Sequence, residues 1–499
     1  MTVSSSRPGI ERHRSWVGAA TRSDIDTLRI LTTAAGIGWS VLFVVIGLRY
    51  ELQTYGDGAM FSYSVAVQDA WAFHWHNISG RVTVYLLSLA PAEAYVELTR
   101  SPGGGVVVYG LLFFVAQFLG LIATFAADRS KGRIIFGYAC FSTACFCPLV
   151  FGFPTEMWIA HAIFWPALTV SHYARRGIFG TALVFALLAA LILTHEGAIV
   201  LAAAIVATVL LRGVWNTTFL RAAGALLAAL AVWAAIKVIF PPDDYFSDVL
   251  VRAALDFFDA SILTGDLFLL LFGAVAGYGA TFLVLVRLTL AKAHFYAAAT
   301  VALLLAIYWF WPDHALHAVD RYFLRTGLVV VTPILGALAA AYALHADGRL
   351  TLPIPILPRL LESFKSCVTA RAIAGALVLV MLVHAVETVK FVSAWTKYKA
   401  AVLALATGSA SDPALGDLHF VSSKRIGPDL DRLSWSSTTQ YLSVILAKFA
   451  PARLVVDPAA NYFWLSCETA TANLKADRAV PAEGRGLVRI HACLHRKEH

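Results

Sequence analysis

The chain has 499 residues, of which 59% are hydrophobic and only 14% are charged. A soluble globular protein is typically about 25% charged and about 45–50% apolar, so these values exclude a water-soluble fold, a disordered chain and a coiled coil. The net charge of +8 is spread between apolar runs without a dense basic patch, which argues against nucleic-acid binding. The composition predicts a mainly α, polytopic helical membrane protein.

The chain begins with a polar segment, residues 1–27, that shows no cleavable signal peptide. About eleven apolar runs of membrane-spanning character follow it. They lie at about 28–49, 105–126, 134–153, 157–174, 178–194, 197–211, 222–239, 267–286, 294–311, 326–344 and 372–390. The fifth and sixth runs meet at residues 194–197, either as a tight helical hairpin or as one broken helix, so the count stays open by one or two.

The segment 81–99 is apolar but contains an arginine, a proline and two glutamates. If it crossed the membrane, the basic loop 128–133 would lie on the side opposite the basic N-terminus. We therefore expect 81–99 to lie along the membrane surface, as an amphipathic part of a long first outer loop, residues 50–104.

The basic residues then predict the orientation. The loops on the side of the N-terminus hold seventeen lysines and arginines, and the loops on the other side hold five. The positive-inside rule makes the N-terminus cytoplasmic. An odd number of spans places residues 391–499 outside, so three regions are expected: the cytoplasmic segment 1–27, the transmembrane domain 28–390, and a periplasmic or extracellular C-terminal domain.

The C-terminal region differs in composition from the rest of the chain. It contains five prolines and strand-like runs such as residues 452–456, which predict a small α/β domain. Cys467 and Cys493 lie in this region, and in an oxidising compartment they either pair or remain as two buried thiols.

Polar residues at the ends of membrane helices are costly and tend to mark function, and here they gather on the predicted outer side. The candidate catalytic residues are Asp57, Glu156, His195 and Glu196. The candidate substrate-binding residues are Tyr55, His74, His76, Arg81, Trp158, Arg321, Tyr322 and Arg325. Such groups suit a substrate with a lipid tail in the bilayer and a polar head in water.

Asp57 is the leading candidate for a general base. It follows the first predicted span closely, and the glycines on both sides of it permit a tight backbone and close approach of a substrate. A carboxylate can take the proton of an attacking hydroxyl. Outer arginines such as Arg81, Arg321 and Arg325 suit a leaving phosphate. The alternative is that Gly-Asp-Gly is only a turn, and that Glu156 only caps the next helix.

This layout resembles the GT-C superfamily of membrane glycosyltransferases. The resemblance rests on the cytoplasmic N-terminus, the long first outer loop with Asp57, the amphipathic stretch 81–99, the many spans and the outer C-terminal domain. It implies inverting transfer of a sugar from a polyprenyl-phosphate carrier to a cell-envelope acceptor, at the outer face of the cytoplasmic membrane. It also implies that Asp57 is the catalytic base or a metal ligand. Asp57 lacks the neighbouring second acid of several branches, so the use of a divalent metal and the branch stay open.

Two other functions fit parts of the sequence. The pair of short runs around His195-Glu196 also suits a secondary transporter, because discontinuous helices bind ions and substrates. A haem or quinone protein would use His161, His172 and His195, but their spacing offers no clean axial pair. The sugar, the acceptor and the oligomeric state are not predicted.

Overall fold

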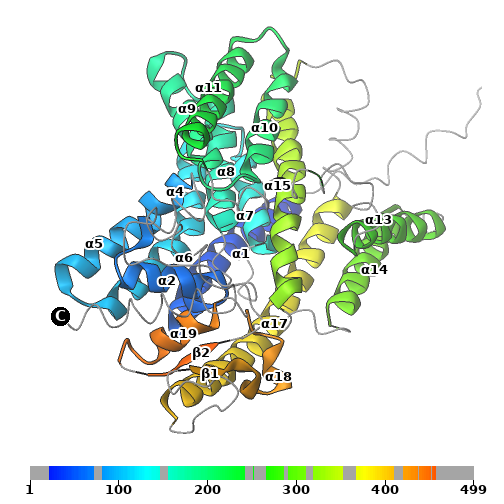
Figure 1. Ribbon diagram of the computed structural model, residues 1–499. Helices are drawn as coiled ribbons and strands as arrows, with labels where there is room; N and C mark the ends of the chain where they lie inside the picture. Colours follow the sequence, from blue (N-terminus) through cyan, green and yellow to red (C-terminus); the bar gives the residue numbers. More distant parts are fainter. Residues whose placement is uncertain are drawn as a thin grey trace, which may run out of the picture.

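The computed structural model is a mainly helical structure, shown in Figure 1. It describes residues 22–71, 81–146, 156–241, 251, 255, 266–285, 290–310, 318–351, 367–408, 420–435, 438–450 and 452–456. The predicted mainly α fold class is confirmed.

The helices are numbered along the chain, and two short strands lie near its C-terminal end. In chain order the elements are α1 (Arg22–Arg49), η2 (Leu52–Thr54), α2 (Asp57–Ala66), α4 (Val82–Val84), the π-helical turn η3 (Tyr85–Leu89), α5 (Ala90–Thr99), α6 (Pro102–Ala127), α7 (Ile134–Phe146), α8 (Glu156–Tyr173), α9 (Ile178–Ile192), α10 (Ala198–Val209), η5 (Leu210–Arg212), α11 (Thr217–Ile239), α13 (Asp266–Leu285), α14 (Leu290–Phe310), α15 (Ala318–Ala346), α17 (Cys367–Thr407), β1 (Phe420–Ser422), η8 (Ser423–Ile426), α18 (Pro428–Asp431), α19 (Thr439–Leu446) and β2 (Leu454–Val456).

Each of the eleven predicted apolar runs overlaps a helix. Within the described residues, five helical stretches are long and apolar enough to cross a membrane, judged by length and composition. They are Asp26–Arg49, Pro102–Ala127, Thr217–Ile239, Leu328–Ala346 and Ile373–Thr407. These stretches support a membrane protein, while the number of spans and their orientation stay predictions.

Close helix packing in the bundle depends on small residues. Gly120 of α6 faces α8 so closely that a Cβ added there would lie 2.4 Å from the carbonyl oxygen of Ala162. Small residues at such contacts allow the backbones of two membrane helices to approach, so a larger side chain at position 120 would force α6 and α8 apart.

Helices α9 and α10 form a hairpin rather than one broken helix. They pack against each other, and the start of α9 and the end of α10 lie at the same end of the bundle. Arg221 of α11 joins these ends, because its Nη1 donates to the carbonyl of Arg175 at 3.1 Å and its charge acts on Arg212. The turn at residues 193–197 therefore lies at the opposite end of the hairpin.

The segment 81–99 is helical through α4, η3 and α5, and it packs against α6. Leu89, Ala92 and Val96 are buried, whereas Leu86 and Leu98 are exposed. Apolar side chains thus occur on both the buried and the exposed sides of this segment, and its amphipathic role along a membrane surface stays a prediction.

The described part of the C-terminal region packs onto the bundle beside α2 and α17 (Figure 1). Strands β1 and β2 pair in parallel, with Val421 opposite Val455, and β2 lies inside the predicted strand at 452–456. The ring of Tyr441 on α19 lies 5.3 Å from that of Tyr63 on α2. Cys467 and Cys493 lie outside the described residues, so their pairing stays a prediction.

Helix α17 is longer than the span predicted from the sequence. It runs without interruption from Cys367 to Thr407, so the predicted boundary at residue 391 lies inside it. The reason is an apolar face that continues at helical spacing beyond that point. Phe391, Trp395 and Tyr398 are buried against the rest of the protein.

Candidate functional site

Four charged side chains from separate parts of the chain meet in one ion-pair network, made up of Arg81, Glu156, Glu196 and Lys237. The Nη1 of Arg81 lies 2.5 Å from Glu156, and its Nη2 lies 3.1 Å from Glu196. The Nε of Arg81 donates a further hydrogen bond to Glu196 at 3.3 Å. Lys237 lies 3.1 Å from the other carboxylate oxygen of Glu196.

Each member of the network lies at the end of a helix. Arg81 precedes α4, Glu156 is the first residue of α8, Glu196 lies in the turn between α9 and α10, and Lys237 lies in the last turn of α11. A hydrogen bond from the backbone N–H of Thr83 to the carbonyl of Leu193, at 3.2 Å, holds the segment of Arg81 and α4 against this turn.

The network is balanced in formal charge, and Arg81 and Glu156 are buried while Glu196 and Lys237 are half-buried. Arg81 is 9% exposed and Glu156 is 4% exposed. Burial acts to raise the pKa of Glu196, but the positive charges of Arg81 and Lys237 outweigh it and hold the pKa below its ordinary value. A carboxylate that binds two cations accepts a proton poorly, so Glu196 is better suited to positioning than to general-base catalysis.

Asp57 is the first residue of α2. The residue before it, Gly56, has a φ of 58°, which a glycine adopts without strain. The start of a helix favours an ionised carboxylate, and the rest of α2 is buried while Asp57 is half-buried. Both Asp57 and Glu156 act electrostatically on the phenol of Tyr109 in α6. Asp57 and Glu156 are therefore both within electrostatic range of the same tyrosine.

Two of the three aromatic residues predicted to bind substrate are part of the core. Tyr55 is buried with its ring 5.1 Å from Phe391 and 5.2 Å from Trp395. Trp158 is also buried, 6.2 Å from the ring of Phe43. These contacts with other core residues explain why both rings are buried, so their positions do not require a bound substrate.

The three histidines that the sequence offered as haem or quinone ligands each make a hydrogen bond within the protein. Gly197 donates its backbone N–H to Nδ1 of His195 at 2.9 Å. His161 lies within hydrogen-bond distance of Ser142 at 2.8 Å, and His172 lies 2.9 Å from the hydroxyl of Thr208. These contacts suit structural roles for all three imidazoles.

Some predicted residues cannot be placed at the site. His74 and His76 lie outside the described residues. Arg321, Tyr322 and Arg325 are on α15, but the structure does not describe their side chains.

Lys237 belongs to the network but was not among the predicted site residues, because it lies inside the predicted span 222–239. A lysine inside an apolar run is itself a signal, because a cation there needs a partner of opposite charge. Glu196 is that partner here.

The described residues contain no group of three or more histidines, cysteines, aspartates or glutamates that would hold a metal ion. The use of a divalent metal therefore stays open.

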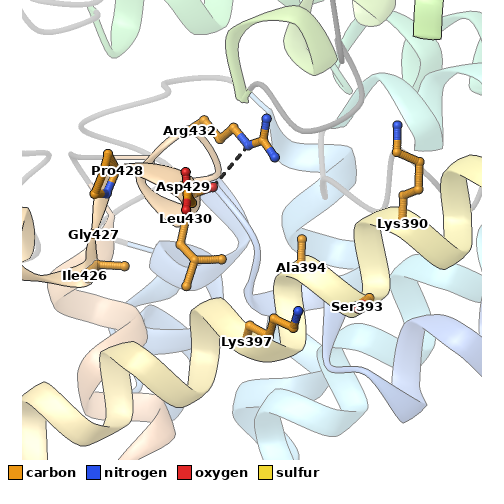
Figure 2. Close-up of a pocket in the computed structure, with 10 residues that line it drawn as sticks. All are labelled: Lys390, Ser393, Ala394, Lys397, Ile426, Gly427, Pro428, Asp429, Leu430 and Arg432. Carbon is orange, nitrogen blue, oxygen red and sulfur yellow. Dashed lines mark hydrogen bonds between the residues drawn. The ribbon is translucent and has the colours of Figure 1, made fainter.

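A cavity of about 630 Å³ lies apart from the predicted site, between α17 and the C-terminal region (Figure 2). Figure 2 shows Lys390 and Lys397 on α17, with Asp429 and Arg432 on the opposite wall. None of the predicted site residues lines it. Its volume is sufficient for a small ligand, and three of these four side chains are cationic.

No family model, curated protein or solved structure matches this chain. The fold therefore defines only a class, a mainly helical protein with candidate membrane spans, and the function must be argued from the site itself.

Proposed function

We propose that this protein is a membrane glycosyltransferase that moves a sugar from a polyprenyl-phosphate carrier to a hydroxyl of a cell-envelope acceptor. The observation that supports this most is that the outer loop, the start of α8 and the turn between α9 and α10 converge through Arg81, Glu156 and Glu196. Asp57 lies on the same predicted outer loop as Arg81, and it acts electrostatically on the same tyrosine as Glu156.

In this proposal Asp57 takes the proton of the acceptor hydroxyl. The hydroxyl oxygen forms a bond to the anomeric carbon of the sugar while the bond from that carbon to the phosphate oxygen breaks. The polyprenyl phosphate leaves with the bonding electron pair, and the configuration at the anomeric carbon is inverted. A general base of this kind contributes about 10²- to 10⁴-fold to the rate.

The ion-pair network has a positioning role in this proposal. Nε, Nη1 and Nη2 of Arg81 each contact a carboxylate, so this guanidinium fixes the outer loop against α8 and the α9–α10 turn. The leaving phosphate needs other cations, and Arg321 and Arg325 on α15 are the candidates that the sequence supplies.

A secondary transporter is the second candidate. Buried ionisable groups inside an apolar bundle are typical of ion and substrate pathways, and the network of Glu196 and Lys237 is such a group. A single broken helix at residues 178–211 would also favour a transporter, but α9 and α10 pack against each other as a hairpin, so this argument does not apply.

The test uses the full chain in proteoliposomes. The donors are a panel of synthetic polyprenyl-phosphate hexoses and pentoses, and an envelope extract supplies the acceptor. We expect Asp57→Asn to lower transfer by about 10²- to 10⁴-fold while the variant folds normally. Glu97→Gln is the matched control, because Glu97 is an exposed acid on the same loop.

Transfer by Asp57→Asn at the wild-type rate would contradict the role of Asp57. Flux of a substrate across the vesicles without any covalent product would favour the transporter.

A further inference from the structure

A second group of charges lies at the other end of the α9–α10 hairpin. Four arginines gather there, two of them beside the ring of Tyr173 and two within electrostatic range of another arginine of the group, and we call them the arginine cluster. They are Arg176, Arg212, Arg221 and Arg349. They come from the loop after α8, the end of η5, the first turns of α11 and the segment after α15.

Tyr173 joins two of these arginines. The guanidinium of Arg212 lies 5.6 Å from the centre of its ring, and that of Arg349 lies 6.0 Å from it. Arg221 and Arg349 both repel Arg212 electrostatically, Asp347 attracts it without forming an ion pair, and Arg176 repels Arg221. Like charges at this range destabilise one another unless an anion compensates them.

The carboxylates nearby are occupied by other donors. Asp347 accepts from the hydroxyl of Tyr173 at 2.7 Å and from the backbone N–H of Lys131 at 2.9 Å. Asp128 accepts from Ser130 and from the backbone N–H of Phe136. Within the part of the chain that the structure describes, no ion pair joins either carboxylate to the arginine cluster.

Several donor atoms of the cluster are buried without a partner. Among the described residues, Nε and Nη2 of Arg212 and Nε of Arg221 are buried and make no hydrogen bond. A buried donor without an acceptor is costly, so three such atoms in one cationic cluster indicate a site for an anion.

Exposed apolar side chains flank the arginine cluster. Ile178 and Phe179 begin α9, and Phe179 is 89% exposed. Trp215 lies between η5 and α11 and is 87% exposed. Aromatic rings beside basic residues are typical of the interface between a bilayer and water. A free phosphate ion would make no use of them, whereas the acyl chains of a lipid would cover them.

We propose that the arginine cluster binds the phosphate headgroup of an anionic phospholipid, with Phe179 and Trp215 against its acyl chains. The guanidinium groups donate to the phosphate oxygens, which the planar geometry of arginine suits. The lipid belongs to the leaflet at this end of the bundle. This inference does not depend on the proposed transfer reaction.

The experiment measures thermal unfolding of the full-length protein in neutral detergent during titration with phosphatidylglycerol. Phosphatidylcholine and inorganic phosphate are titrated in parallel. We expect phosphatidylglycerol to raise the unfolding temperature in a saturable way, and phosphatidylcholine and inorganic phosphate to have little effect. Replacing two arginines, Arg212→Gln with Arg349→Gln, should raise the half-saturating concentration about tenfold or more.

Two further variants control this result. Lys424→Gln with Arg425→Gln removes the same charge from two exposed residues of the C-terminal region, and it should leave the titration unchanged. Phe179→Ser with Trp215→Ser keeps all four arginines and should weaken the effect of the lipid. If the double arginine variant does not fold, the single Arg349→Gln variant replaces it, because Arg349 is exposed.

An unchanged half-saturating concentration in the arginine variant would overturn the proposal, as would equal stabilisation by phosphatidylcholine. If inorganic phosphate stabilises the protein equally and competes with phosphatidylglycerol, the site binds a free phosphate and the lipid assignment is wrong.

Discussion

The ion-pair network and the arginine cluster lie at opposite ends of the same helical hairpin, and they compensate charge in different ways. In the network, Arg81 and Lys237 face Glu156 and Glu196, so every charge has a partner inside the protein. In the cluster, the arginines face one another, and the nearby carboxylates bond to other groups.

This difference teaches that burial of charge alone does not identify a binding site. A buried charge with all its partners within the protein stabilises a particular arrangement of loops once the chain has folded. A buried donor without an acceptor instead indicates that something outside the protein completes the structure. The network is therefore expected to govern folding, and the cluster is expected to govern interaction with lipid.

The largest expected effect on stability comes from breaking the network at its centre. Arg81→Met leaves Glu156 without its ion-pair partner and Glu196 with Lys237 alone, and unpaired buried charge costs about 3–5 kcal/mol of unfolding free energy. Equilibrium unfolding in mixed detergent micelles measures this loss. Combining Arg81→Met with Glu156→Gln should recover part of it, since Glu196 keeps Lys237 and no carboxylate of the network is then left without a cation.

Arg212→Met is the matched comparison at the other end of the hairpin. This substitution leaves no carboxylate unpaired and relieves repulsion from Arg349, so in lipid-free detergent the loss should stay below about 1 kcal/mol. Equal losses for Arg81→Met and Arg212→Met would remove the distinction between the two regions.

The sequence alone was sufficient to predict part of this picture. The apolar runs located the helices, because each run is long enough to indicate one. Glu156 and Glu196 stood out because they are acids at the ends of apolar runs, and Arg81 stood out as one of the few basic residues of the outer loops. Their ion pairs were not predicted, since residues 81, 156 and 196 are far apart in sequence.

The arginine cluster and the full length of α17 could not be predicted. The four arginines lie in separate segments of the chain that meet only when α8, α11 and α15 pack together. In α17 the lysines after residue 389 lower the hydropathy and suggest the end of a span. The helix continues because one of its faces stays apolar, which a window average does not detect.

The next prediction concerns pH. The folded-state pKa of Glu196 is lower than the ordinary value of 4.5, so its ionised form stabilises the fold. This contribution is fully present above about pH 4.5 and is lost as the pH falls through the lower folded-state pKa. Unfolding measured from pH 7 downwards should show a steeper loss for the wild type than for Glu196→Gln. Parallel pH profiles would show that Glu196 does not carry this stabilisation.

The smallest expected effect belongs to an ion pair between Glu51, in the turn after α1, and Lys399 of α17, which is partly open to water. Lys399 lies 2.5 Å from Glu51, whose side chain is 53% exposed. Pairs of this kind contribute about 0–1 kcal/mol and weaken in salt, because water and counterions screen them. Lys399→Met should therefore lower the unfolding free energy by at most about 1 kcal/mol.

Lys399 also donates to the carbonyl of Tyr50 at 3.0 Å, so Glu51→Gln, which keeps that bond, should cost less. Added salt should reduce the cost of both substitutions and leave that of Arg81→Met nearly unchanged, because the network is shielded from solvent. If Lys399→Met proved as damaging as Arg81→Met, burial would not be what makes the network important.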